Sequence, residues 1–189
     1  MAICPSCGKK ALDPITRSKP YLIIKEGYTH NEYEQGLPFT TSGMNKWNKQ
    51  ENTTSYYLMK ELGMVGLNMQ VMSLGAFWSH IPPKSNGKDG KEQFGKCLDW
   101  SISEVIRLAE GKRIILMMGA EVVRTFTGYG VSDVSGLICK SDLLPVTNAP
   151  IIIPAPNPDN IMKQPIGELR NALNVFAEQI KIFEEYAKV

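Results

Sequence analysis

The stretch Arg113-Ile-Ile-Leu-Met-Met-Gly-Ala-Glu-Val-Val123 decides the fold. Its first part, residues 113–118, is a short apolar run of strand length, and Gly119 to Val123 opens a helix directly behind it. A strand that passes at once into a helix is the unit from which parallel sheets are built. The sequence on either side of this unit should therefore alternate between strands and helices.

Three other apolar segments predict strands, namely residues 20–24, 69–78 and 150–154. Helical spacing, with caps at residues 52–55 and stops at Gly63 and Gly111, predicts helices over residues 56–62, 93–110 and 166–187. Polar, glycine-punctuated stretches predict loops over residues 25–37 and 81–91. This alternation predicts an α/β fold: a three-layer α/β/α sandwich with a mainly parallel central sheet.

Length and composition are those of an ordinary globular protein. The chain has 189 residues, of which 43% are hydrophobic and 21% charged, and we expect one monomeric domain over residues 1–189. The net charge of +2 does not demand a nucleic-acid partner, and it leaves room for a local basic face. No apolar run is long enough to span a membrane, and the first residues do not resemble a signal peptide. We therefore expect a cytoplasmic protein.

Cys4-Pro-Ser-Cys7 forms a tight knuckle within an N-terminal segment, residues 1–19. In a reducing compartment such a knuckle indicates metal or redox chemistry, and two free thiols on a loose tail are the alternative. A thioredoxin-like redox site would need a strand before the motif and a helix opening at it. A closed metal site needs four ligands, so the other two must come from far along the chain.

Two polar loops follow predicted strands. The loop after Ile24 contains Glu26, Gly27, His30 and Glu32, and the loop after Ile153 contains Asn157, Asp159 and Asn160. In open α/β sheets, ligands bind beyond the carboxyl ends of the strands, so these loops are the candidate site.

The motifs in these loops resemble those of the uracil-DNA glycosylase superfamily, most closely its family 4, the iron–sulfur members. Lys25-Glu-Gly-Tyr-Thr29, followed by Gly36-Leu-Pro-Phe39, is similar to that family's first motif in order and spacing. Leu116-Met-Met-Gly-Ala-Glu121 is similar to the apolar strand of the family that ends in Leu-Gly-Ala. The resemblance extends from Cys4 to the last helix.

This chain differs from the family pattern at two places that bear on which base is excised. Where the family has His-Pro, this chain has Pro156-Asn157-Pro158, which is more similar to the motif of the mismatch-specific uracil glycosylases. Near the end of the second strand, where the family has an asparagine that reads uracil, Ser73-Leu-Gly-Ala76 offers no amide.

The resemblance also implies a metal centre. The family holds a [4Fe–4S] cluster with four cysteines, and Cys4, Cys7 and Cys97 match three of them. The remaining position, two residues before Pro82-Pro83, is His80. Three cysteines and a histidine suit either an iron–sulfur cluster or zinc. Cys139 lies outside this set, and we expect it to be a buried strand residue.

By the same resemblance, the protein hydrolyses the N-glycosidic bond of uracil or a related modified pyrimidine after flipping the base out of DNA. The catalytic residues would be Glu26, which orients water or stabilises the sugar cation, and Asn157, which bonds the base or the water. The substrate-binding residues would be Gly27, Tyr28, Glu32 and Phe39, with Phe39 stacked on the base. Ile161 and Met162 would fill the gap in the duplex, and Lys163 would contact a phosphate.

Each of these residues also has a structural interpretation. Glu26 could be a solvated carboxylate, Phe39 a core residue, and Asn157 the start of a turn. Ile161 and Met162 could pack under the last helix. Lys84, Lys88 and Lys91 form a basic loop of the kind that contacts phosphates or is simply solvated.

The competing function is a non-catalytic module that binds DNA or a replication or repair protein such as a polymerase. A nucleotide-binding protein would need a glycine-rich phosphate loop, and neither of the two common forms is present.

Overall fold

The computed structural model describes residues 2–41, 53–80, 88–145, 147–158 and 166–188. Within these residues, four strands form one sheet in the order β2-β1-β3-β4, and every neighbouring pair is parallel. The strands are β1 (Tyr21–Gly27), β2 (Ser73–Trp78), β3 (Ile114–Met118) and β4 (Ile151–Ala155). The prediction of a parallel sheet is confirmed.

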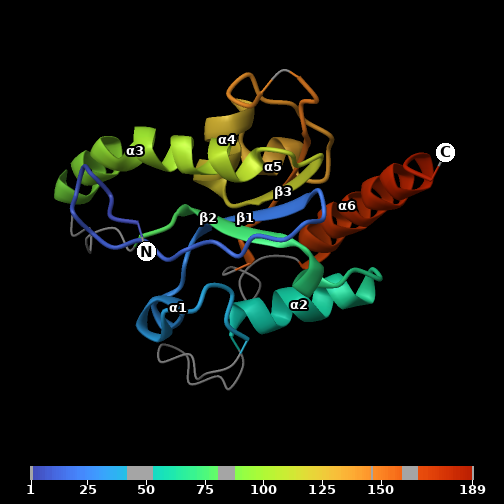
Figure 1. The fold of residues 1–189 in the computed structure, drawn as a ribbon, viewed down its shortest axis with the longest axis horizontal. Helices are drawn as coiled ribbons and strands as arrows, with labels where there is room; N and C mark the ends of the chain where they lie inside the picture. The colour runs from blue at the N-terminus through green and yellow to red at the C-terminus, as the bar shows by residue number, and fades with distance from the viewer. Residues whose placement is uncertain (1, 42–52, 81–87, 146, 159–165, 189) are drawn as a thin grey trace.

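Helices cover both faces of this sheet (Figure 1). One face packs against α2 (Thr54–Met64) and α6 (Ile166–Tyr186). The other packs against α3 (Lys88–Ala109), α4 (Ala120–Thr127) and the short α5 (Val131–Val134). The architecture is therefore the expected three-layer α/β/α sandwich.

The strands are largely apolar because both of their faces are buried, and the charged residues Lys25 and Glu26 come at the end of β1. In β3, Ile114, Leu116 and Met118 face the α2–α6 side, whereas Ile115 and Met117 face the α3–α4 side. Side chains alternate between the faces of a strand, so a strand between two helical layers needs apolar residues at every position. This is why a continuous apolar run predicts each strand.

The region predicted as a loop, residues 25–37, contains more structure than expected. Its first residues, Lys25 to Gly27, complete β1, and α1 (His30–Gln35) follows. Thr29 caps this helix in a capping box with Glu32, and Gly36 ends it with a left-handed backbone. A helix of six residues is too short to show a periodic apolar pattern, so periodicity misses it.

Other boundaries differ from the prediction by a few residues. The predicted strand over residues 69–78 divides into the 3-10 helix η1 (Met69–Val71) and β2, and α2 runs through Gly63 to Met64. Helix α3 begins at Lys88, inside the predicted loop over residues 81–91, and residues 81–87 lie outside the described part. None of the helices in the described residues has the combined length and apolar character needed to cross a bilayer.

The N-terminal segment runs along β2 at the edge of the sheet. Ile15 forms an antiparallel bridge with Leu74, and the Leu12 N–H donates to the Ser79 carbonyl at 2.8 Å. Because the segment and β2 run in opposite directions, residues earlier than Leu12 lie beyond the carboxyl end of β2. The cysteine knuckle is thereby delivered to the same edge of the sheet as the loops after the strands.

Candidate functional site

The strand register brings the ends of β1, β3 and β4 together. Lys25 pairs with Met118, and Met118 pairs with Ala155. One position further along, the three strands reach Glu26, Gly119 and Pro156, and the Gly119 N–H donates to the Ala155 carbonyl at 3.0 Å. Glu26 and the segment that carries Asn157 therefore leave the same carboxyl edge, with β3 between them.

Glu26 belongs to strand β1, and the prediction that it lies on a loop is wrong. Its half-buried side chain lies against Gly119, where a Cβ atom would overlap the carboxylate. Gly119 has a φ of 122° and is the N-cap of α4. The Glu26 carboxylate is thus seated at the amino end of a helix, which favours negative charge.

Asn157 follows β4 and is half-buried at the same edge. It is the last predicted site residue that can be placed on this side, because Ile161, Met162 and Lys163 lie outside the described residues, as do Asp159, Asn160 and Lys84. The expected DNA wedge and phosphate contact remain predictions.

Gly27 and Tyr28 lead out of β1, and Gly27 still pairs with Trp78 of β2. The Tyr28 hydroxyl is buried and has no hydrogen-bond partner among the described residues. Burial raises the pKa of Tyr28 well above its usual range, and the nearby Glu32 charge adds to the shift. The phenol is therefore protonated at any physiological pH.

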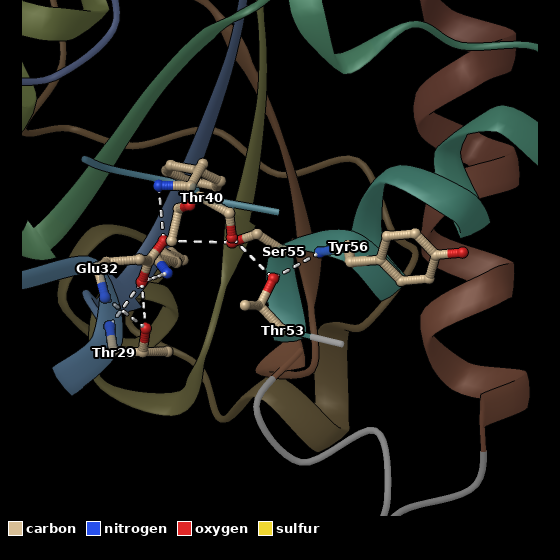
Figure 2. A network of polar contacts seen from close by, with 8 residues as sticks. Thr29, Glu32, Thr40, Thr53, Ser55 and Tyr56 are labelled. Atoms are coloured by element: carbon tan, nitrogen blue, oxygen red, sulfur yellow. Dashed lines mark hydrogen bonds and ion pairs between the residues drawn. The ribbon is translucent and has the colours of Figure 1, made fainter. Parts of the chain in front are cut away.

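Glu32 is predicted to bind substrate, but both of its carboxylate oxygens accept hydrogen bonds from the chain itself. The donors include Lys25, the backbone and hydroxyl of Thr29, the backbone of Phe39 and the hydroxyl of Ser55 (Figure 2). Glu32 is 1% exposed, so its side chain points into the protein rather than toward a substrate on the surface.

Phe39 is 4% exposed and lies in the hydrophobic core of the α2–α6 side. Its ring meets Tyr28 edge to face at 6.2 Å between centroids, and the Lys25 ammonium lies 4.8 Å from its centroid. Stacking on an extruded base remains a prediction for this ring, which would have to exchange part of its present packing for the base.

The four predicted metal ligands lie together. Cys4 and Cys7 come from the N-terminal turn, His80 follows β2, and Cys97 projects from α3. Their ligand atoms all lie within 4.8 Å of one another, and the Sγ atoms of Cys4 and Cys97 are 3.8 Å apart. Cys4, His80 and Cys97 are buried, whereas Cys7 is half-buried. A group that could bind a metal ion is therefore present.

The protonation chemistry of this group suits metal binding. Burial opposes a charge on Cys4, but N–H groups of Cys7 and Ser6 hydrogen-bond its sulfur, and on balance the pKa of the Cys4 thiol is lowered. Burial, assisted by contacts with Cys7 and Cys4, raises the pKa of Cys97 to about 12. A metal ion binds the thiolate form of cysteine, so its binding to Cys97 would displace the thiol proton.

His80 contributes an imidazole ring in the neutral form that binds metal ions. Burial lowers its pKa, and the charge of Lys9 lowers it further, so the ring is neutral at physiological pH. Its Nδ1 atom is buried without a hydrogen-bond partner among the described residues. A buried, unsatisfied ring nitrogen beside three thiols fits a metal-ligand role, because a metal would satisfy it.

Cys139, expected to be a buried strand residue, lies outside the named strands. It forms an isolated bridge with Ile152 of β4 and is half-buried. Burial raises the pKa of its thiol, which lowers the fraction of thiolate, the reactive form.

Sequence reasoning misses two features near this edge. Lys25 is a fully buried lysine, and a charge directly after Tyr21-Leu-Ile-Ile24 is the available signal, because a buried cation requires a partner. A cavity of about 330 Å³ lies between α3 and α4, with Phe77 and Trp78 on its wall and a 2.7 Å hydrogen bond from the Trp78 indole to Glu121. No local sequence pattern predicts that cavity, because its lining residues come from β2, α3 and α4.

Comparisons with known proteins leave the family open. No protein-family model matches the chain, and no curated protein sequence matches it.

Proposed function

We propose that this protein is a monofunctional DNA glycosylase that hydrolyses the N-glycosidic bond of uracil or a related modified pyrimidine. One observation carries the proposal. The sheet brings the end of β1 with Glu26, the amino end of α4 at Gly119, and the segment with Asn157 to one edge, beside the Cys4–Cys7–His80–Cys97 group. These are the motif segments on which the resemblance to uracil-DNA glycosylases rests.

The chemistry needs charge stabilisation on both sides of a breaking bond. The sugar becomes cation-like, so a carboxylate held at Glu26 lowers its energy or orients the attacking water. The base leaves as an anion, and N–H groups around Gly27 and Tyr28, together with the Asn157 amide, can donate to it. Because a neutral amide carries no positive charge, we expect slower chemistry than a histidine would support at that position.

The metal centre has a structural role in this proposal. It joins the N-terminal segment to α3 and to the end of β2, and no reaction step passes through it. Around one tetrahedral zinc ion with Zn–S bonds of about 2.3 Å, two sulfurs lie about 3.8 Å apart. The 3.8 Å between the sulfurs of Cys4 and Cys97 matches that value.

A [4Fe–4S] cluster, which the resemblance implies, binds each ligand to a different iron and spreads the ligands farther apart. The ligand spacing therefore favours a single ion, zinc, over the cluster. Elemental analysis of anaerobically purified protein tests this. Stoichiometric zinc in a colourless protein supports the single ion, whereas iron with broad absorbance near about 400 nm supports the cluster. If the protein contains neither zinc nor iron, both the single-ion and the cluster proposals fail.

The decisive experiment is incubation with uracil-containing single- and double-stranded DNA, followed by alkali to reveal abasic sites. Modified pyrimidines are tested as further substrates, because Ser73-Leu-Gly-Ala76, near the place where the family has a uracil-reading asparagine, offers no amide. Glu26→Gln should lower the single-turnover rate by about 100-fold or more, since it removes the charge at nearly constant shape. Glu178→Gln on the exposed side of α6 is the matched control and should leave the rate unchanged.

Asn157→Ala should also lower the rate, by roughly 100-fold, through loss of one transition-state hydrogen bond. Full activity in both the Glu26 and Asn157 variants would overturn the site assignment.

The second candidate is a non-catalytic platform that binds DNA or a polymerase-associated protein. Two departures from the family pattern favour it: Asn157 stands where the family has histidine, and the uracil-reading asparagine is absent from Ser73-Leu-Gly-Ala76. A wild-type protein that binds DNA tightly yet excises no base from any tested substrate would select this candidate.

A further inference from the structure

Lys25 is a charged residue in an apolar strand. It follows Tyr21 and Ile23 on the face of β1 that packs toward α2 and α6, and it is 1% exposed. A buried ammonium is costly unless a counter-charge accompanies it. Glu32 of α1 supplies that charge through a direct ion pair, and both side chains are almost completely buried.

The same carboxylate ties four segments together (Figure 2). Its Oε2 atom accepts from Lys25 Nζ, from the Thr29 N–H at 2.6 Å and from the Thr29 hydroxyl at 2.8 Å. Its Oε1 atom accepts from the Phe39 N–H at 2.6 Å and from the Ser55 hydroxyl at 3.2 Å. One side chain therefore links β1, the start of α1, the chain after α1 and the start of α2.

Phe39 needs such a restraint. Its φ of 55° lies in the left-handed region, which is unfavourable for a bulky residue, and the hydrogen bond to Glu32 helps to hold it there. The Lys25 ammonium lies 4.8 Å from the Phe39 ring centroid and 5.4 Å from that of Tyr28. Both distances fall within the range of cation–π attraction, so the pair also orients the two rings.

We propose that Lys25 and Glu32 are positioning residues for base recognition, acting through the backbone of residues 27–39 and the ring of Phe39. The inference rests on the proposed function, because that segment carries the N–H groups and the ring expected to bind the flipped base. Neither side chain touches the base. Their task is to hold the loop in its binding geometry before DNA arrives, which spares the ordering cost on binding.

An amide cannot replace this carboxylate. The backbone N–H groups of Thr29 and Phe39 donate to different oxygens of Glu32. A glutamine at position 32 has one oxygen and one NH₂ group, so one of the two backbone donors must face another donor. The double variant Lys25→Met with Glu32→Gln removes both buried charges at similar volume, and replacing a buried ion pair in this way is often tolerated by the fold.

The experiment compares this double variant with the wild type by amide hydrogen exchange and by single-turnover excision of uracil and modified pyrimidines. At a temperature where both proteins are folded, the amide of Thr29 or Phe39 should exchange about tenfold faster in the variant. The excision rate should fall by about tenfold or more, because misplacement of binding groups is costly. The matched control is the double variant Glu61→Gln with Arg170→Met, which removes another ion pair and should change neither quantity.

Unchanged protection of both amides would overturn the inference, as would faster exchange with an unchanged excision rate. If the double variant does not fold, Glu32→Asp replaces it. Aspartate keeps the charge for Lys25 but is one methylene too short to reach both N–H groups, so the same two changes are expected. A wild-type protein that excises nothing overturns the proposed function itself, whereas an active wild type with an insensitive variant overturns only the positioning role.

Discussion

At Gly119 the absence of a Cβ atom leaves the space that the Glu26 carboxylate occupies. The Gly119 φ of 122° disfavours any other residue, and a Cβ there would overlap the Glu26 carboxylate. Gly128 also has a positive φ, 78°, but a Cβ at that position meets nothing within 4 Å. The two glycines therefore separate the cost of backbone strain from the cost of displacing Glu26.

Gly119→Ala should lower stability by about 1–3 kcal/mol through strain and should also abolish excision by moving Glu26. Gly128→Ala should lose only the backbone contribution, about 1 kcal/mol, and keep its activity. Thermal melts and single-turnover rates of the two variants measure this difference. Equal activities would show that Glu26 can occupy another position without loss.

At the residue scale, the sequence predicts positions better than it predicts roles. The family resemblance predicts that Cys4, Cys7, His80 and Cys97 form one group, and the four residues do lie together. Glu32 is predicted to bind substrate, yet its oxygens face inward. A polar residue between two motifs looks the same in sequence whether it points to solvent or to a buried lysine, because the distinction depends on contacts between β1, α1 and α2.

At the scale of elements, a polar pair joins α2 to α6 on the face opposite α3. Arg170 donates two hydrogen bonds to Glu61, at 2.7 and 3.0 Å. These bonds, more than any other influence, lower the pKa of Glu61. Because the pKa is lower in the folded state, the pair stabilises the fold above the unfolded pKa, and this contribution disappears as the pH falls through the folded value.

Glu61→Gln should therefore lower the thermal midpoint at pH 7 by about 2 °C, and its effect should shrink as the pH falls below the ordinary pKa of a glutamate, because the contribution of the ion pair is lost in that range. Melting curves of both proteins across this pH range provide the test. A midpoint difference that does not change with pH would mean that charge is not the reason for the effect.

Elements are predictable where burial imposes a pattern. All four strands are predictable because both faces of the sheet are covered, and α3 and α6 are predictable because each has one buried face. Helices α1, α5 and η1 escape prediction because three to six residues are held by caps and neighbours rather than by periodicity. The parallel register, which aligns Glu26 with Gly119, follows from pairing between distant strands, and the sequence predicts it only as a general rule for such sheets.

For the whole molecule, a metal ion bound by Cys4, Cys7, His80 and Cys97, as we propose, would cross-link the N-terminal segment to α3 and to the end of β2. Cys97→Ser or removal of the metal by a chelator should lower the thermal midpoint by several degrees, because metal binding contributes directly to folding free energy. Cys139→Ser, outside the group, is the control. Melts with and without chelator measure the shift, and an equal response of both variants would argue against a bound metal.

DNA binding should be governed by charge across the whole surface rather than by base sequence. With a net charge of +2, affinity depends on scattered lysines and should fall steeply with salt between about 50 and 200 mM. Titration of one fluorescent duplex at several salt concentrations measures the slope. Affinity that ignores salt would contradict a phosphate-binding surface.

The predicted metal ligands are far apart along the chain, so the ribosome makes them at different times. Cys4 and Cys97 are 93 positions apart, so at roughly 5–20 residues per second the last ligand leaves the ribosome about 5–20 s after the first. The knuckle by itself offers two ligands, His80 adds a third, and Cys97 is the last to be made, before β3 and β4 are complete. If the group binds a metal as we propose, all four ligands can hold it only after this part of α3 has been synthesised.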